Sequence, residues 1–138
     1  MALEFQRTMS IAASGMRLQG ERLKVIAENL ANAQSVGETP SDLPYRRKIL
    51  TFRNEFDRAM GTDLVKVKGI DVDQSDFKRE HEPGHPAADQ DGYVLYPNVQ
   101  TVIELNDMRE ASRSYQANLS VIEMTRTMLN QTIQLLRR

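Results

Sequence analysis

Two long stretches at the ends of the chain have the periodicity of amphipathic helices. In residues 8–34, positions spaced alternately three and four apart are apolar except at Gln19. This row is Met9, Ala12, Met16, Gln19, Leu23, Ile26, Leu30 and Ala33. Such a narrow stripe packs one helix against another in a coiled coil. The pattern predicts an N-terminal helix with Met16, Leu23, Ile26 and Leu30 as assembly contacts.

The same pattern recurs over residues 99–137, where no proline or glycine interrupts it. One row is Leu105, Met108, Ser112, Tyr115, Leu119, Ile122, Arg126, Leu129, Ile133 and Leu136, and a second is Ala117, Val121, Met124, Met128 and Leu135. Two rows are wider than one coiled-coil seam, so this helix is expected to touch more than one neighbouring helix. The predicted contacts are the apolar members of the first row: Leu105, Met108, Tyr115, Leu119, Ile122, Leu129, Ile133 and Leu136. Asn98, after Pro97, is the predicted N-cap.

The middle of the chain has a different pattern. Residues 35–44 have the composition of a loop, and strands are predicted at 45–53, 64–73 and 93–96. Pro83-Gly84 and Asp91-Gly92 are turn signals between the strands. The predicted fold class is α+β, with terminal α-helices forming a coiled-coil-like pair around a small β-rich insert. The predicted divisions are 1–36, 37–97 and 98–138.

The terminal helices carry more apolar surface than they can hide from water as an antiparallel pair. Surplus apolar surface of this kind indicates a polymer or a multi-subunit bundle. Gly15 and Gly20 lower the stability of the N-terminal helix by roughly 1 kcal/mol each relative to alanine. An isolated helix of this kind is marginal, so we expect it to become ordered on assembly.

Composition narrows the function classes. The 138 residues carry a net charge of −1, which argues against a nucleic-acid binder, and the absence of cysteine excludes disulfides and thiolate metal sites. No apolar run approaches the ~20 residues that span a bilayer, so direct membrane insertion is not expected. The first residues lack the apolar core of a secretory signal. By itself this predicts a cytoplasmic protein, unless export follows another route.

Candidate catalytic and metal sites are weak. His81 and His85 are four residues apart, but Pro83, Gly84 and Pro86 prevent a helix, so we expect a rigid turn and no metal. Residues 71–82 have the ligand spacing of a calcium loop, yet Asp76 occupies the position that requires glycine. There is no nucleophile arrangement and no glycine-rich phosphate loop. We therefore predict no enzyme activity and no cofactor.

Charge is unevenly distributed along the insert. Residues 46–68 hold seven basic and three acidic side chains, whereas residues 71–91 hold two basic and seven acidic ones. The basic cluster Arg46-Arg47-Lys48 beside Tyr45 is too small for nucleic acid. It is interpreted either as a charged strand edge that resists stray pairing or as a subunit contact. Head-to-tail docking of the two oppositely charged segments is one hypothesis.

Motifs at both ends resemble the rod and hook axial proteins of the bacterial flagellum. The N-terminal motifs are Ala13-Ser14-Gly15-Met16, Gln19, Arg22-Leu23, Val25-Ile26-Ala27 and Asn29-Leu30-Ala31-Asn32. The C-terminal ones are Asn98-Val99, Glu104, Met108, Ala111, Arg113, Tyr115 and Ala117-Asn118. Between them, Pro44-Tyr45-Arg46-Arg47-Lys48, Pro83-Gly84-His85-Pro86-Ala87, Asp91-Gly92-Tyr93-Val94 and Pro97-Asn98-Val99 narrow the resemblance to the proximal-rod members. Leu105, where methionine is expected, and Gln34-Ser35 depart from the family pattern.

The resemblance implies a structural subunit of the proximal rod, which polymerises through its terminal helices into a drive shaft that transmits torque. The helices would form an inner tubular layer, with the insert facing outward. The implied partners are the chain itself, the rod proteins FlgB, FlgF and FlgG, the FliE adaptor and the flagellar type III export apparatus. Export without a cleaved signal peptide would place the chain in the periplasm-spanning basal body. The alternatives are another rod subunit, FlgB-like or FlgF-like, or a cytoplasmic coiled-coil adaptor.

Overall fold

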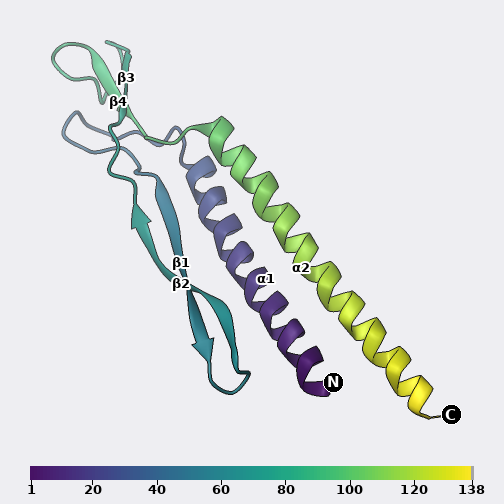
Figure 1. Cartoon of the computed structure of the whole chain (residues 1–138). Coiled ribbons are helices and arrows are strands. Elements are labelled where there is room, and N and C mark those ends of the chain that lie inside the picture. Colours follow the sequence, from purple (N-terminus) through teal and green to yellow (C-terminus); the bar gives the residue numbers. More distant parts are fainter. Residues whose placement is uncertain (138) are drawn as a thin grey trace. The chain divides into compact units, whose positions relative to one another are not determined.

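The computed structural model describes residues 1–137; a long helix lies at each end of the sequence, and four strands lie between them in chain order (Figure 1). In chain order the elements are α1 (Ala2–Ala31), β1 (Lys48–Asp57), β2 (Thr62–Val72), β3 (Lys78–His81), β4 (Tyr93–Tyr96) and α2 (Thr101–Leu136). The strands form two two-stranded sheets, β1 with β2 and β3 with β4. The predicted α+β class with terminal helices is confirmed.

The chain forms two compact units, and both helices run through both of them. Unit 1 comprises Met1–Leu23, Thr51–Gly69 and the chain from Arg109 onward. Unit 2 comprises Lys24–Leu50 and Ile70–Met108. This division by contacts differs from the predicted division into three consecutive segments, because each unit combines helical and strand segments that are distant in sequence.

In unit 1 the two helices lie antiparallel and very close. A Cβ atom at Gly15 would come within 2.8 Å of Asn118 Nδ2, and Arg22 Nη2 lies 3.7 Å from Glu110 Oε2. Gly15 thus faces Asn118, and the later residue Arg22 faces the earlier residue Glu110. The two helices therefore run in opposite directions. The buried apolar residues of this unit, Ala12, Leu18 and Ala111, are mostly small, which permits the close approach.

Helix α1 begins before the predicted start at residue 8. An ion pair between Arg7 Nη1 and Glu4 Oε1, at 3.1 Å, supports its first turns. The helix ends at Ala31, where Asn32 Nδ2 donates to Glu28 O at 2.8 Å. This bond occupies a carbonyl in the last turn, so Asn32 acts as a stop signal and the chain turns at residues 32–34.

Helix α2 begins at Thr101, and Asn98 is not its N-cap. Glu104 N donates to Gln100 O at 3.0 Å, which makes Gln100 the residue at the cap position. The Asn98 side chain is engaged elsewhere, because its Oδ1 accepts the Arg47 amide at 2.7 Å. The prediction of a cap was therefore wrong, although the predicted helix exists.

The first predicted strand is displaced along the sequence. Residues 45–47 lie outside β1 because the Arg47 amide donates to the Asn98 side chain and not to a strand. The side chains of Tyr45 and Arg46 also hydrogen-bond to residues distant in sequence. Strand β2 and strand β4 lie where they were predicted, to within two residues. Strand β3 was not predicted, because Lys78–His81 are all exposed and carry no apolar alternation. No helix within residues 1–137 is long and apolar enough to cross a membrane.

Candidate functional site

Asn29, in the last turns of α1, is the centre of a polar cluster in unit 2. Its Nδ2 donates to Lys48 O at 2.9 Å and to Glu104 Oε2 at 3.2 Å. Its Oδ1 accepts the Lys48 amide at 2.9 Å and the Tyr45 hydroxyl at 2.8 Å. These four bonds occupy every hydrogen-bonding position of the amide group. The residue is 1% exposed, so the bonds are shielded from water.

Arg47 connects the cluster to the start of α2. Its Nε donates to Glu104 Oε1, its Nη1 lies 3.5 Å from Asp73 Oδ2, and its Nη2 lies 3.7 Å from Asp107 Oδ2. Glu104 is 1% exposed, and a buried carboxylate needs a cation and further hydrogen bonds to be tolerated. Arg47 and Asn29 supply them.

Asn98 and Arg46 hold the end of β2. Asn98 Nδ2 donates to Asp73 O at 3.0 Å and to Ser75 Oγ at 3.0 Å. Arg46 Nη1 donates to the same Asp73 carbonyl at 2.9 Å, and its guanidinium carbon lies 4.2 Å from the centre of the Phe77 ring. We call the whole set the polar clamp; it consists of Asn29, Tyr45, Arg46, Arg47, Lys48, Asp73, Asn98 and Glu104.

The clamp changes the pKa values of its members. Burial acts to lower the pKa of Arg47, but the hydrogen bonds and charges of Glu104 and Asp73 outweigh it and raise the pKa. The Ser75 amide and hydroxyl, followed by Arg47, lower the pKa of Asp73 despite its partial desolvation. Burial raises the pKa of the Tyr45 hydroxyl. All these shifts hold each group in the protonation state that the clamp uses at neutral pH.

The clamp connects structural elements through hydrogen bonds and ion pairs. Arg47 is engaged with the Glu104 and Asp73 carboxylates, and Arg46 donates to the Asp73 carbonyl. Within residues 1–137, no group of three or more His, Asp or Glu side chains is arranged to hold a metal ion. The hydrogen bonds and ion pairs of the clamp join the end of α1, the start of α2 and the residues that flank the β1–β2 hairpin.

A second group of predicted residues lies in the β3–β4 hairpin of unit 2. Residues 83–87 form turns, in which His85 Nδ1 accepts the Ala87 amide at 3.1 Å. Gly92 has a φ of +80°, and a Cβ there would meet Pro83 at 3.3 Å, so both backbone conformation and space require glycine. His81 meets Tyr93 edge to face, with ring centroids 5.1 Å apart. The turn predicted for Pro83, Gly84, His85 and Pro86 is present in the structure.

The basic residues of the predicted contact cluster are used inside the chain. Arg46 and Arg47 belong to the clamp, and Lys48 Nζ lies 2.9 Å from Glu28 Oε2. This pair lowers the pKa of Glu28 and raises the pKa of Lys48. The interpretation of these residues as a charged strand edge is wrong for Arg46 and Arg47, which precede β1, and all three have partners within the fold.

The least exposed positions of α2 do not follow the predicted row. Buried positions recur every seven residues at Glu104, Ala111 and Thr125, with half-buried Asn118 in the same line. Half-buried Met108, Tyr115, Ile122 and Leu129 form the neighbouring line, whereas Leu105, Leu119, Ile133 and Leu136 are 39–80% exposed. The innermost line is small or polar, so a search for apolar periodicity passed over it. On α1, Met16, Leu23, Ile26 and Leu30 are all half-buried or buried.

Sequence motifs thus converge in space to different degrees. Asn29, Tyr45, Arg46, Arg47 and Asn98 come together in the clamp, with buried Pro97 beside Asn98. Asn118 packs at Gly15, Asn32 ends α1, and Arg113 is exposed on α2. Glu104 was among the family motifs but was not predicted as a site residue. The sequence signal that could have identified Glu104 is its seven-residue spacing from Ala111, which places it on the same face of α2 as the small buried residues.

Comparison with known proteins agrees with the motifs. The family model described as flagellar basal body rod FlgEFG protein C-terminal matches residues 90–135. The flagellar basal-body rod protein FlgC of Agrobacterium fabrum is 53% identical, over 92% of this chain and 91% of its own. FlgC of Salmonella typhimurium is 42% identical, over 91% and 92%, and that of Borreliella burgdorferi is 33% identical, over 94% and 95%.

These relatives are aligned over nearly their whole length, and the alignments span both terminal helices and the strands between them. The motifs that build the polar clamp and the β3–β4 turn lie within the same span. The chain therefore belongs to the FlgC family of flagellar basal-body rod proteins.

Proposed function

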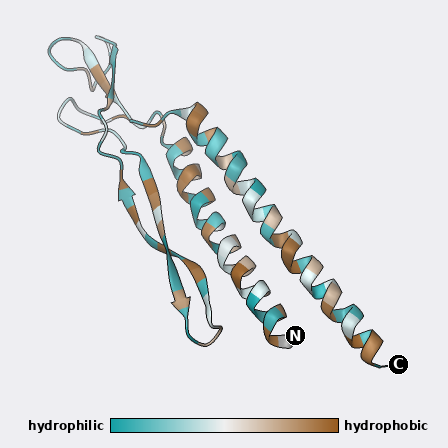
Figure 2. Cartoon of the chain, viewed as in Figure 1, coloured by the Kyte–Doolittle hydropathy of each residue, from teal (hydrophilic) through white to brown (hydrophobic). Residues whose placement is uncertain are grey.

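We propose that this structural rod subunit polymerises through α1 and α2 and forms part of the proximal drive shaft that transmits torque. The observation that carries the proposal is the apolar surface of α2 that the chain itself leaves uncovered. Figure 2 shows apolar positions recurring along this helix and along the β1–β2 hairpin. In a monomer that stayed alone, this surface would remain in contact with water.

The uncovered surface of α2 forms two flanks, one on each side of its buried line. Leu105, Leu119 and Ile133 are fourteen residues apart and occupy one flank, at 39–46% exposure. Val121, Met128 and Leu135 are seven residues apart and occupy the other, at 39–73% exposure. Residues seven apart share a line on a coiled-coil helix, so Val121, Met128 and Leu135 form a continuous apolar stripe. On the first flank, Ser112 and Arg126 lie between the three apolar residues, so this stripe is interrupted. Two separate stripes favour contact with at least two neighbouring subunits.

Burial of these side chains supplies the driving force for assembly. Fully covering a leucine, isoleucine or methionine side chain contributes roughly 1.5–3 kcal/mol. A helix end that is unstable alone can therefore be held firmly once neighbours cover both flanks. We propose FlgB, FlgF and FlgG, the FliE adaptor and further copies of the chain as these neighbours.

The route to the basal body is part of the same proposal. The chain would leave the cytoplasm through the flagellar type III export apparatus, keep its N-terminus and end in the periplasm-spanning rod. The relatives are named as rod proteins, which supports a structural role over a catalytic one. An exported rod subunit is expected to leave wild-type cells and to stay inside a mutant that lacks flagellar secretion. A cytoplasmic adaptor would instead stay inside both strains.

Leu119→Asp tests the assembly surface. A charge on the exposed flank is expected to reduce incorporation into basal bodies at least tenfold, because burying an unpaired carboxylate costs several kcal/mol. Ser120→Asp is the matched control, since Ser120 is exposed on the same helix and points away from both the flank and the buried line. The measurement is the amount of each variant in purified basal bodies, relative to its amount in the cell.

The control variant is expected to incorporate normally and to support motility. Equal incorporation of the two variants would show that the Leu119 flank is not an assembly surface. Far-ultraviolet circular dichroism of both purified variants separates loss of assembly from loss of helix.

A further inference from the structure

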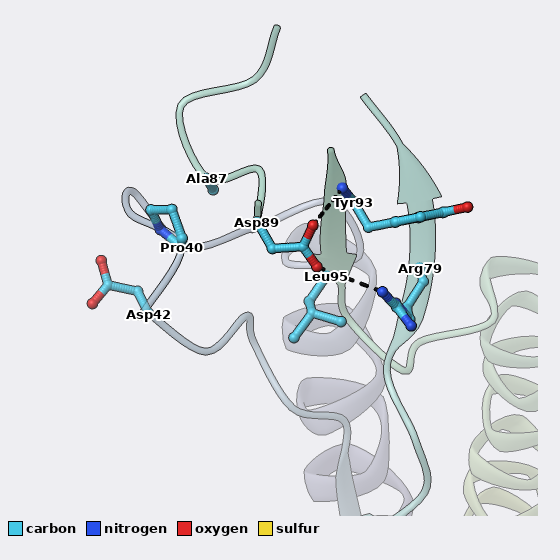
Figure 3. A pocket seen from close by; sticks show the side chains of 8 residues that line it. Pro40, Asp42, Arg79, Ala87, Asp89, Tyr93 and Leu95 are labelled. Atoms are coloured by element: carbon cyan, nitrogen blue, oxygen red, sulfur yellow. Dashed lines mark hydrogen bonds and ion pairs between the residues drawn. The ribbon is translucent and has the colours of Figure 1, made fainter. Parts of the chain in front are cut away.

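Unit 2 contains a cleft of about 370 Å³ beside the β3–β4 hairpin (Figure 3). Its walls are the loop that holds Gly37, Pro40 and Asp42, the strand residues Arg79, Tyr93 and Leu95, and the turn that holds Ala87 and Asp89. None of these residues belongs to the polar clamp. The cleft is large enough for two or three side chains.

The carboxylates of the cleft are held by fixed loops. Asp42 Oδ2 accepts the Thr39 amide at 3.1 Å and the Thr39 hydroxyl at 2.8 Å. A Cβ at Gly37 would come within 2.6 Å of Asp42 O, so only glycine permits this loop to close. Asp89 Oδ1 accepts the amides of Asp91, at 3.0 Å, and Tyr93, at 2.8 Å. These bonds fix both carboxylates and leave Asp42 Oδ1 outside them, whereas Asp89 Oδ2 faces Arg79.

The lining has a definite chemical character. Arg79 lies 3.5 Å from Asp89 Oδ2 and 4.6 Å from the centre of the Tyr93 ring, so its charge is already partly balanced. Glu38 and Asp91, which adjoin the lining residues in sequence, are exposed and add negative charge. Pro40, Ala87 and Leu95 provide an apolar wall. The cleft therefore suits a basic side chain that has an apolar neighbour.

The edge of β4 adds an unused backbone position. Glu82 N donates to Gly92 O at 2.9 Å, and the register pairs Glu80 with Val94 and Arg79 with Leu95. Because antiparallel pairs alternate, Leu95 belongs to a pair that is not hydrogen-bonded, and its amide and carbonyl point away from β3. The equivalent groups of Tyr93 are bonded to Asp89, whereas the described residues offer Leu95 no partner on that edge.

The turn of the β1–β2 hairpin has the complementary chemistry. Arg58 is exposed, and none of the described residues pairs with it. Phe56, two residues earlier, is 60% exposed. The turn is rigid, because Asp57 Oδ1 accepts the amides of Ala59, at 2.9 Å, and Met60, at 3.1 Å, and Arg7 Nε donates to Met60 O at 2.7 Å. Docking of such a turn costs little conformational entropy, because the turn is already held in one conformation.

We propose that the acidic cleft of one copy receives Arg58 and Phe56 from the β1–β2 turn of a second copy. Arg58 would pair with the carboxylate of Asp42, whose Oδ1 takes no part in the bonds to Thr39, and Phe56 would cover Pro40 and Leu95. Two different surfaces meet in this contact, so it is heterologous and repeats along an open filament. The proposal rests on the proposed function, in that the copies meet within a rod.

Site-specific cross-linking tests the contact, because the chain has no cysteine of its own. Cells lacking the native copy would express Pro40→Cys and Ala59→Cys on two separate chains, which keeps Asp42, Asp89 and Arg58 intact. Basal bodies are purified, oxidised and resolved on a non-reducing gel. The pair Pro40→Cys with Asn54→Cys is the control, since Asn54 is exposed on the same hairpin but away from its turn.

A disulfide-linked dimer is expected for the Ala59 pair and not for the Asn54 pair. Adding Arg58→Glu to the Ala59 chain should lower the dimer yield severalfold, and Arg58→Lys should largely preserve it. Basal bodies that contain both cysteine variants without a dimer, or equal dimer from both pairs, would overturn the proposal while leaving the rod function intact.

If the cysteine variants fail to incorporate, the otherwise unmodified chain with Arg58→Glu decides the question. Its incorporation should fall severalfold below that of Arg58→Lys and of Arg53→Glu, which places the same charge on an exposed part of the hairpin. Equal incorporation of the three variants would contradict the contact. Absence of the unmodified chain from basal bodies would instead contradict the proposed function.

Discussion

Among single residues, Asn29 has the largest predicted effect on stability. Its amide joins α1 to the Lys48 backbone, the Tyr45 hydroxyl and the Glu104 carboxylate, and no water reaches the group. A shorter side chain would leave a backbone amide, a carbonyl and a hydroxyl without partners inside the protein. Each buried group left in this state costs about 1–3 kcal/mol.

Asn29→Ala is therefore expected to destabilise the chain by roughly 3–4 kcal/mol, near the upper end for single substitutions. The measurement is the urea midpoint followed by circular dichroism. Asn54→Ala is the control, because Asn54 is exposed and lies outside the polar clamp; its midpoint should be unchanged. Similar midpoints for the two variants would show that the clamp contributes little to stability.

The two glycines of α1 are expected to respond in opposite ways to alanine. Gly20 has no atom within 4 Å of an added Cβ, so Gly20→Ala should stabilise the helix by about 0.5–1 kcal/mol. At Gly15 the added Cβ would lie 2.8 Å from Asn118 Nδ2, which donates to Ser114 O at 3.0 Å. Asn118 must then move, and the cost of moving it offsets the stability that alanine adds through its higher helix propensity.

Thermal unfolding of the two variants compares these sites directly. Gly20→Ala should raise the melting temperature, and Gly15→Ala should leave it unchanged or lower it. An equal increase in both would mean that the close approach of α1 and α2 at Gly15 imposes no constraint.

Among the elements, the β1–β2 hairpin is attached to the helices by charged groups at its base. Asp73 receives the Ser75 amide and hydroxyl and faces Arg47, and these contacts lower the pKa of Asp73. A carboxylate with a lowered folded-state pKa adds stability above its unfolded pKa, and this stability is lost as the pH falls through the folded value. Glu28, whose pKa is lowered by Lys48, acts in the same direction.

The chain is therefore expected to lose stability progressively as the pH falls below about 5, as these carboxylates become protonated. Asp73→Asn should be less stable than the parent at neutral pH and should lose less on acidification. The observable is the urea midpoint at several pH values. Asp76→Asn, at an exposed neighbouring aspartate, should follow the parent curve; if Asp73→Asn also follows it, the base of the hairpin is not held by the Asp73 carboxylate.

For the whole molecule, the two units differ in what they bury. The largest side chains with under 2% exposure are Glu104, Val94, Val99, Asn29 and Pro97, and all of them belong to unit 2. The buried apolar residues of unit 1 are Ala12, Leu18 and Ala111, and its part of α2 leaves seven large apolar side chains exposed between Leu119 and Leu136. Fewer buried contacts allow local opening at lower free energy.

Hydrogen exchange of the free subunit should therefore be slower in unit 2 than in unit 1. The amides of Arg47 and Lys48, which donate to Asn98 and Asn29, are expected among the most protected. The last turns of α2 and the first turns of α1 should exchange fastest. Mass spectrometry of peptides from both helices measures this, and uniform protection along α1 and α2 would contradict the difference between the units.

The sequence by itself determined the elements whose signals are local. Both helices follow from apolar periodicity without interrupting proline, and the turns at residues 83–87 and 91–92 follow from proline and glycine. The family also follows from motifs that can be read in order along the chain. Each of these signals depends on residues within a few positions of one another.

The tertiary structure decided which residues meet. Asn98 has the sequence context of an N-cap, but its side chain bonds to Arg47 and Asp73, which are distant in sequence. The Arg46-Arg47-Lys48 cluster resembled a free charged edge, yet Arg47 pairs with Glu104 and Asp73, Lys48 pairs with Glu28, and Arg46 donates to the Asp73 carbonyl. The buried line of α2 is formed by Glu104, Ala111, Asn118 and Thr125, because two helices that approach closely at Gly15 need small or internally bonded partners more than bulky apolar ones. Local pattern can predict an apolar stripe, but only the packed chain shows which face its own helices cover and which they leave for a neighbour.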